Sequence, residues 1–257
     1  MNEETKERVT RLVRQMGKRV LLKSKQRMGE FFQSALKKPF HVLFFPQKAI
    51  VVSELERSIT RVIGQEFYTD IAKIVAEERF EDVRRNRTID GAVDTGMVRR
   101  LDDIIEALDR GRKKPNCRAE MEEILRSRVG STTTQTVTAD LFIGDFEGGP
   151  LCLEFKTPWP KKEDCVRSKK RIVLFKLIQA DLTPQAYIAF PYNPFESWDK
   201  WHWTAPMVFD REEVKIAEEG WDMLGGSGTY EALLRLSAEV GKEIREEVGL
   251  FKGLVEE

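Results

Sequence analysis

Apolar residues recur at helical spacing along the first part of the chain, with basic residues between them. The first such run covers residues 9–21 and predicts an amphipathic helix. Pro39 and Pro46 interrupt the pattern. Ser53 and Glu56 then have the spacing of a capping box, which predicts that a second, longer helix begins at Ser53 and continues to about residue 74. Residues 86–118 are expected to combine a short helix with polar loop, with turns near residues 94–96 and 111–115.

From residue 132 onward the pattern becomes that of a β-structure. Threonine and valine dominate residues 132–143, and residues 151–156 form a second apolar run, so the two predict a β-hairpin around a glycine-containing turn. A helix over residues 165–180, a strand over 185–190 and a last helix over 229–247 follow. This order predicts an α/β fold with a central mixed β-sheet flanked by helices. We expect one domain over residues 1–257, with 1–50 as a basic helical arm and 51–257 as the core with its carboxyl-terminal helix.

Composition restricts the class of protein without naming a partner. The 257 residues are 41% apolar, and 43 bases balance 43 acids, so net charge indicates nothing about ligands. No apolar run is long enough to cross a membrane, and no targeting segment is visible, so a cytoplasmic protein without membrane contact is expected. Three cysteines with no paired spacing predict neither disulfides nor a zinc knuckle. With only two histidines, any enzymatic chemistry must rely on carboxylates, lysine or a hard metal ion.

Three charged residues of the predicted hairpin carry the clearest chemical signal. Asp140 lies in the first strand, while Glu154 and Lys156 lie on one face of the second, because strand side chains alternate faces. The hairpin would bring the two carboxylates and the ammonium group together. With the backbone carbonyl of Phe155, these carboxylates could provide part of the shell of a Mg²⁺ ion, and the lysine could assist a water attacking a phosphodiester. The alternative is a set of cross-strand ion pairs on the surface.

The charged residues near this predicted hairpin help to decide between a metal site and surface ion pairs. Residues 156–176 contain eight bases and two acids, which would suit a polyphosphate substrate, although a solvated helix face gives the same count. Glu66 falls on the apolar stripe of the predicted long helix, where a carboxylate is unusual unless it binds a metal or is paired. Tyr192 and Asn193 could reach DNA, or could form a turn between prolines. The expected DNA contacts are Lys161, Lys162, Arg167, Lys169, Lys170, Arg171, Tyr192 and Asn193.

The sequence Asp140, a gap of thirteen residues, then Glu154-Phe155-Lys156 resembles the PD-(D/E)xK nuclease motif, with alanine at position 139 in place of proline. More of the chain resembles the TdeIII/MjaII-type branch of type II restriction endonucleases. The similar segments are residues 64–72, 139–142, 154–160, 167–169, 191–194 and 221–230.

This resemblance implies a Mg²⁺-dependent homodimer that cuts double-stranded DNA at a short palindrome, GGNCC in this branch. Asp140 and Glu154 would be metal ligands, with Glu66 as a candidate third, and Lys156 the catalytic lysine. Mn²⁺ is expected to substitute for Mg²⁺, and a companion DNA methyltransferase acting on the same site is expected in the same prokaryotic cytoplasm. Two other functions fit the residues: a repair or junction-cutting nuclease on the same core, and a DNA-binding protein without catalysis.

Overall fold

A computed structural model describes residues 1–26, 29–30, 33, 37, 43–44, 47–62, 64–201 and 204–248. The chain forms two compact units, one of residues 1–71 and 231–257 and the other of residues 72–230. The expectation of a single domain stays a prediction. No helix in the described part of the chain is long and apolar enough to span a membrane.

The first unit is helical. It contains α1 (Glu3–Gln26), α4 (Gln47–Val62), the beginning of α5 (Gln65–Ala76) and most of α11 (Thr229–Val248). The amino-terminal helix is confirmed; Val9 and Val20 of its predicted apolar run are buried, and the other apolar positions of that run are half-buried. Helix α1 packs closely on α11, because a Cβ atom on Gly17 would lie 2.6 Å from Ile244 Cδ1.

The predicted long helix from Ser53 is wrong in two respects. Helix α4 begins at Gln47, six residues earlier, so Ser53 is an exposed position inside the helix and not its cap. The helix also ends at Val62, and Gly64 separates it from α5. Glycine is the poorest helix former after proline, which accounts for a break inside an otherwise periodic pattern.

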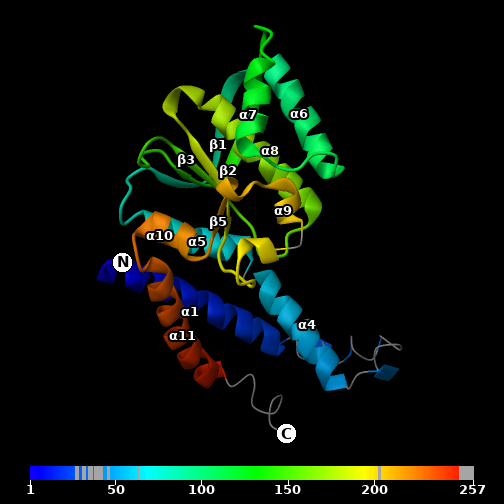
Figure 1. Ribbon diagram of the computed structural model, residues 1–257. Coiled ribbons are helices and arrows are strands. Elements are labelled where there is room, and N and C mark those ends of the chain that lie inside the picture. The colour runs from blue at the N-terminus through cyan, green and yellow to red at the C-terminus, as the bar shows by residue number, and fades with distance from the viewer. Residues whose placement is uncertain are drawn as a thin grey trace. The chain divides into compact units, whose positions relative to one another are not determined.

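The second unit is built on one sheet of five strands, and its mixed character confirms the predicted fold class (Figure 1). Its order is β1-β2-β3-β4-β5; β1, β2 and β3 are antiparallel neighbours, and β3, β4 and β5 are parallel. The strands are β1 (Val83–Asp94), β2 (Thr132–Ile143), β3 (Leu151–Phe155), β4 (Gln185–Phe190) and β5 (Val214–Ile216). The hairpin of β2 and β3 and the strand β4 are confirmed within a residue.

Strand β1 was not expected, since residues 86–118 were assigned to short helix and loop. Half of its positions are exposed to solvent, and all of these except Ala92 are polar, so it lacks the signal of a buried strand. Asp94 ends the strand and caps α6 (Thr95–Asp109), because its carboxylate accepts hydrogen bonds from the Gly96 and Met97 amides.

Helix α8 (Lys162–Ile178) packs across β1 to β4, and α6 and α7 (Cys117–Arg126) lie beside it (Figure 1). The remaining helical elements are η1 (Ala180–Leu182), η2 (Trp198–Lys200), α9 (Ala205–Val208), η3 (Arg211–Glu213) and α10 (Glu218–Gly225). The core between sheet and helices includes Ile172 and Phe175 of α8 and Ile188 and Phe190 of β4. This packing fixes α8 against the strands that carry the candidate site.

Candidate active site

The candidate site lies where β3 and β4 end side by side. The two strands are parallel, with Phe155 opposite Ala189, and the Lys156 amide donates to the Ala189 carbonyl at 3.0 Å. Ligand sites of α/β sheets commonly form beyond the carboxyl ends of parallel strands. Glu154 and Lys156 therefore occupy a position suited to binding a substrate.

Strand β2 changes face at Asp140. Val137 and Ala139 share a core cluster with Phe142, although regular alternation would place Phe142 on the opposite face. On the neighbouring strand, Asn86 has a left-handed backbone with φ of 49°, at the position between the pairs on either side of Asp140. Asparagine tolerates that conformation better than most residues. The regular pairing of β1 with β2 is thus interrupted at Asp140 itself.

The Asp140 carboxylate reaches the end of β3, where its Oδ2 accepts a hydrogen bond from the Phe155 amide at 2.9 Å. The antiparallel pairing of β2 with β3 stops at Leu141 and Leu153, one residue before Asp140 and Glu154. The structure therefore brings Asp140, Glu154 and Lys156 together, as their spacing predicts. Their chemical roles stay a prediction.

Glu154 is completely buried, and its two carboxylate oxygens have different surroundings. Oε2 accepts from Arg171 Nη1 at 3.0 Å and from Ser168 Oγ at 3.3 Å, and it lies 3.9 Å from Lys156 Nζ. Oε1 is buried without a hydrogen-bond partner. Burial raises the pKa of Glu154 to about 7, and the negative charge of Asp140 adds to the increase, while Lys156 and Arg171 oppose it.

This arrangement fits a hard divalent cation. A buried carboxylate oxygen without a partner is costly, and a cation would satisfy it. Oxygen donors from two neighbouring carboxylates are the ligands that Mg²⁺ and Mn²⁺ prefer. The role of the Phe155 carbonyl stays a prediction.

A third acidic ligand is not found. Within the described residues, no group of three or more His, Cys, Asp or Glu side chains is placed to hold a metal ion. The reasoning that singled out Glu66 is wrong, because this residue is not on a continuous buried stripe: it is exposed in the first turn of α5. Its part in metal binding stays a prediction without structural support.

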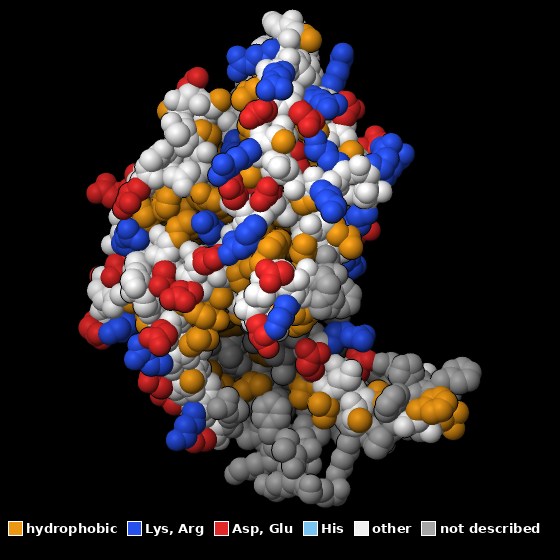
Figure 2. Space-filling view, viewed as in Figure 1, with side chains coloured by type: hydrophobic (Ala, Val, Ile, Leu, Met, Phe, Trp, Pro, Cys, Tyr) orange, Lys and Arg blue, Asp and Glu red, His pale blue; other side chains and the backbone are white. Residues whose placement is uncertain are grey.

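Contact between DNA and the basic helix predicted over residues 165–180 stays a prediction, but the structure shows what surrounds its bases. Most of the bases expected to contact DNA there are paired with carboxylates of the same chain. The pairs are Lys162 with Asp109 at 3.3 Å, Lys170 with Asp102 at 2.6 Å, Arg171 with Glu154 at 3.0 Å, and Arg167 with Asp164. Lys161 is exposed at the amino-terminal cap of α8. On the face shown in Figure 2, Lys and Arg side chains are mixed with Asp and Glu side chains and do not form one continuous patch.

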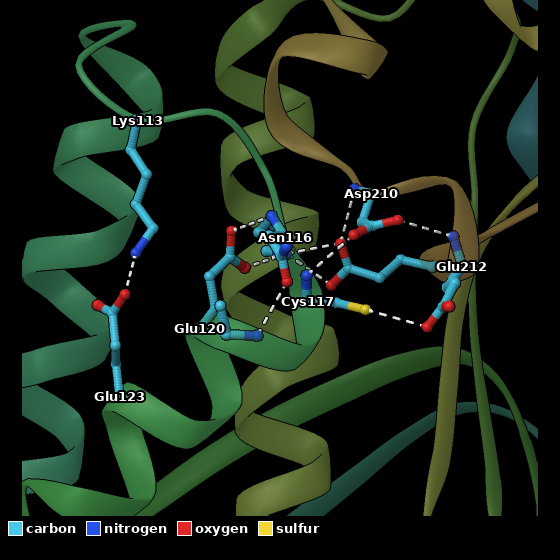
Figure 3. A network of polar contacts seen from close by, with 10 residues as sticks. Lys113, Asn116, Cys117, Glu120, Glu123, Asp210 and Glu212 are labelled. Atoms are coloured by element: carbon cyan, nitrogen blue, oxygen red, sulfur yellow. Dashed lines mark hydrogen bonds and ion pairs between the residues drawn. The ribbon is translucent and has the colours of Figure 1, made fainter.

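Lys169 is the clearest departure from the expected DNA contacts. Its side chain is wholly buried, and its Nζ lies 2.6 Å from carboxylate oxygens of both Glu120 and Glu213. Figure 3 shows the network around these groups, in which Glu120 also accepts from the Asn116 amide at 2.9 Å and Asp210 accepts from the Cys117 amide at 3.2 Å. Lys169 in this position is unavailable to DNA and ties α8 to α7 and η3.

Tyr192 and Asn193 follow β4, and Asn193 has a structural role. Its Oδ1 accepts from the Phe195 amide and from Trp201 Nε1, both at 3.0 Å. The bond from the Phe195 amide is that of a turn flanked by prolines, which is the alternative to DNA contact for Asn193. Tyr192 is half-buried beside it, and DNA contact by either residue stays a prediction.

Sequence reasoning missed the residues that hold Glu154 and α8 in place. Ser168 was given no role, and Arg171 was expected to bind DNA, yet both contact the Glu154 carboxylate. Because they are three residues apart on a helix, Ser168 and Arg171 lie on one face. Once Glu154 is considered a candidate site residue, this spacing could have identified them as its partners. Glu120 and Glu213 are far from Lys169 in sequence and carry no local pattern that could have identified them.

A mixed sheet flanked by helices, with two acids and a lysine brought together where the pairing of β2 with β3 stops, is consistent with an α/β fold of the restriction-endonuclease type. A family model described as "Type II restriction endonuclease, HinfI" matches residues 1–241. The chain therefore belongs to the HinfI family of type II restriction endonucleases, which are site-specific DNA endonucleases.

Individual relatives agree with this assignment. The chain is 29% identical over 212 residues to the type II restriction enzyme HgiBI of Herpetosiphon aurantiacus, covering 79% of this chain and 77% of that one. It is 25% identical over 218 residues to the type II restriction enzyme MjaII of Methanocaldococcus jannaschii, covering 76% of this chain and 56% of that one. No solved structure matches the chain.

Proposed function

We propose that this endonuclease cleaves DNA with the help of a divalent cation, Mg²⁺ or Mn²⁺, held by Asp140 and Glu154. The observation that carries the proposal is the unpartnered Oε1 of Glu154, buried next to a second carboxylate. In this site a cation would stabilise the negative charge that develops on the scissile phosphate and would acidify the attacking water.

The chain's own residues would orient the reactants. The Lys156 side chain is only 13% exposed and lies 3.9 Å from Glu154 Oε2, so its ammonium group is held at the carboxylate cluster. There it can donate hydrogen bonds to the attacking water or to a phosphate oxygen. Asp140 is kept in position by the Phe155 amide, which limits rotation of its carboxylate.

The target and partners are part of the same proposal. The resemblance to the TdeIII/MjaII-type branch supports a short palindrome, GGNCC, and the relatives with type II restriction enzyme names support site-specific cleavage. A palindromic target suits a homodimer, because two-fold symmetry in the protein then matches that of the site. A companion methyltransferase would protect the same sequence in host DNA.

The test is incubation of the purified protein with plasmid DNA in Mg²⁺, Mn²⁺ or EDTA. We expect discrete fragments with either metal and none with EDTA, and sequencing of the ends would identify the site. Lys156→Ala should retain DNA binding in Ca²⁺ while cleavage falls by several orders of magnitude. Lys200→Ala, which removes an exposed lysine paired with Glu196, is the matched control and should cut normally. Undiminished cleavage by Lys156→Ala, or cleavage in EDTA, would refute the proposed site.

A further inference from the structure

The two oxygens of the Glu154 carboxylate differ in a way that restricts how many cations can bind. Oε2 is surrounded by donors: the Arg171 guanidinium, the Ser168 hydroxyl and, slightly farther away, the Lys156 ammonium. Oε1 is buried and has no hydrogen-bond partner. Only Oε1 is therefore available as a metal ligand without displacing an existing contact.

The charges near Oε2 oppose a second cation. Sites with two metal ions hold them about 3.5–4 Å apart, commonly with bridging carboxylate oxygens. A cation bridged by Oε2 would lie close to the Arg171 and Lys156 charges. Asp140 and Glu154 supply two negative charges, which Lys156 and Arg171 already balance before any metal enters. Within the described residues, no third acidic ligand joins the site to offset a second divalent ion.

The contacts of Ser168 and Arg171 with Glu154 are fixed by the position of their helix. Between them in sequence, Lys169 lies on the buried side of α8 and pairs with Glu120 and Glu213, both almost completely buried. Moving Arg171 away from Glu154 by shifting α8 would require breaking that ion triad. Arg171 itself keeps a side chain that is 42% exposed, so its guanidinium borders the space open to solvent.

We propose that Ser168 and Arg171 are positioning residues that leave Glu154 one ligating oxygen, so that each chain binds a single divalent cation, with the Arg171 guanidinium in the place of a second. This inference rests on the proposed function and adds the stoichiometry of its metal site.

Mn²⁺ binding to the full-length protein without DNA tests the proposal, because electron paramagnetic resonance distinguishes free from bound Mn²⁺ and isolated from exchange-coupled ions. We expect one bound ion per wild-type chain with no exchange coupling. Arg171→Met should admit a second, weaker ion with a coupled signal, whereas Arg171→Lys keeps the charge and should bind one. Lys170→Met removes the neighbouring exposed base, which pairs with Asp102, and should also bind one. Circular dichroism would verify that each variant is folded.

Each outcome separates this inference from the proposed function. Two coupled ions in the wild-type protein would overturn the single-cation site while leaving metal-dependent cleavage intact. A single ion in Arg171→Met would overturn the role given to Arg171. Unchanged Mn²⁺ binding by Glu154→Gln would instead show that the metal does not bind at this carboxylate, which would overturn the proposed function itself.

Discussion

Replacing Lys169 by methionine should destabilise the protein far more than replacing its neighbour Lys170. Lys169 is wholly buried, and its ammonium group lies 2.6 Å from oxygens of Glu120 and Glu213, which are each 2% exposed. Methionine keeps most of the apolar stem but removes the charge. Two carboxylates would then remain buried together with no cation between them.

The expected cost follows from that burial. Breaking a buried ion pair by removing one partner costs about 3–5 kcal/mol, because the remaining charge has no compensation. Lys170 pairs with Asp102 at the same distance, 2.6 Å, but these side chains are 39% and 51% exposed. An exposed pair contributes about 0–1 kcal/mol, so Lys170→Met is the matched control. Replacing Lys169, Glu120 and Glu213 together with Met, Gln and Gln should recover most of the loss, since no uncompensated charge is left.

Urea unfolding followed by tryptophan fluorescence would measure these differences, because all five tryptophans lie between residues 159 and 221, within the sheet-containing unit. The effect should also depend on pH. Burial raises the pKa of Glu213 in the folded protein, so the native state holds a proton there more tightly than the unfolded chain does. Lowering the pH from 8 towards 5 should therefore reduce the penalty of Lys169→Met. A loss no larger than that of Lys170→Met, unchanged between these pH values, would refute the reasoning.

Three further outcomes are expected. Because burial raises the pKa of Glu154 to about 7, the affinity for Mn²⁺ should rise about tenfold per pH unit below that value and level off above it, and Glu154→Gln should abolish this dependence in a titration series. Cys152 and Cys165 are buried, which raises the pKa of both thiols, so a thiolate-specific reagent at pH 8 should modify them slowly in the native protein and quickly in the urea-unfolded protein; equal rates at these two positions would contradict their buried placement. Gly149→Ala should lower the unfolding midpoint markedly, because φ is 136° there and the new Cβ would lie 2.3 Å from the Leu182 carbonyl oxygen, whereas Gly130→Ala, with open space around it, should cost less.

Local patterns predicted the elements that depend on local physics. Strand β2 matches its predicted range because threonines, which favour strands, dominate its first part and mostly apolar residues follow from Val137 to Ile143. Strand β1 was missed because it is stabilised by hydrogen bonds to β2, which lies far along the chain. The sequence of β1 itself has no pattern that indicates a strand. The edge strand β5 is only three residues long, too short for any period to be recognised.

The proximity of the candidate catalytic residues could be predicted for the same reason, since the hairpin of β2 and β3 brings the segments of Asp140, Glu154 and Lys156 together. Their surroundings could not. Counting bases over residues 156–176 gave a surplus that resembled a DNA-binding surface, but Lys169 and Lys170 pair with acids of α6, α7 and η3. A local charge count omits partners that are distant in sequence and near in space.

These pairings change what α8 can contribute to the enzyme. Three of its bases, Lys162, Lys169 and Lys170, pair with acids of other segments, and Arg171 holds Glu154, so part of the charge of α8 is compensated within the chain. The favourable release of counterions from DNA depends on bases that are free to meet phosphates. A helix that orients a candidate metal ligand must also keep a fixed position. The buried ion pairs of Lys169 and the packing of α8 against the sheet restrict its movement. The pairings of Lys169 and Arg171 therefore give part of the charge of α8 a role in positioning the candidate active site, and DNA contact by the exposed bases of α8 stays a prediction.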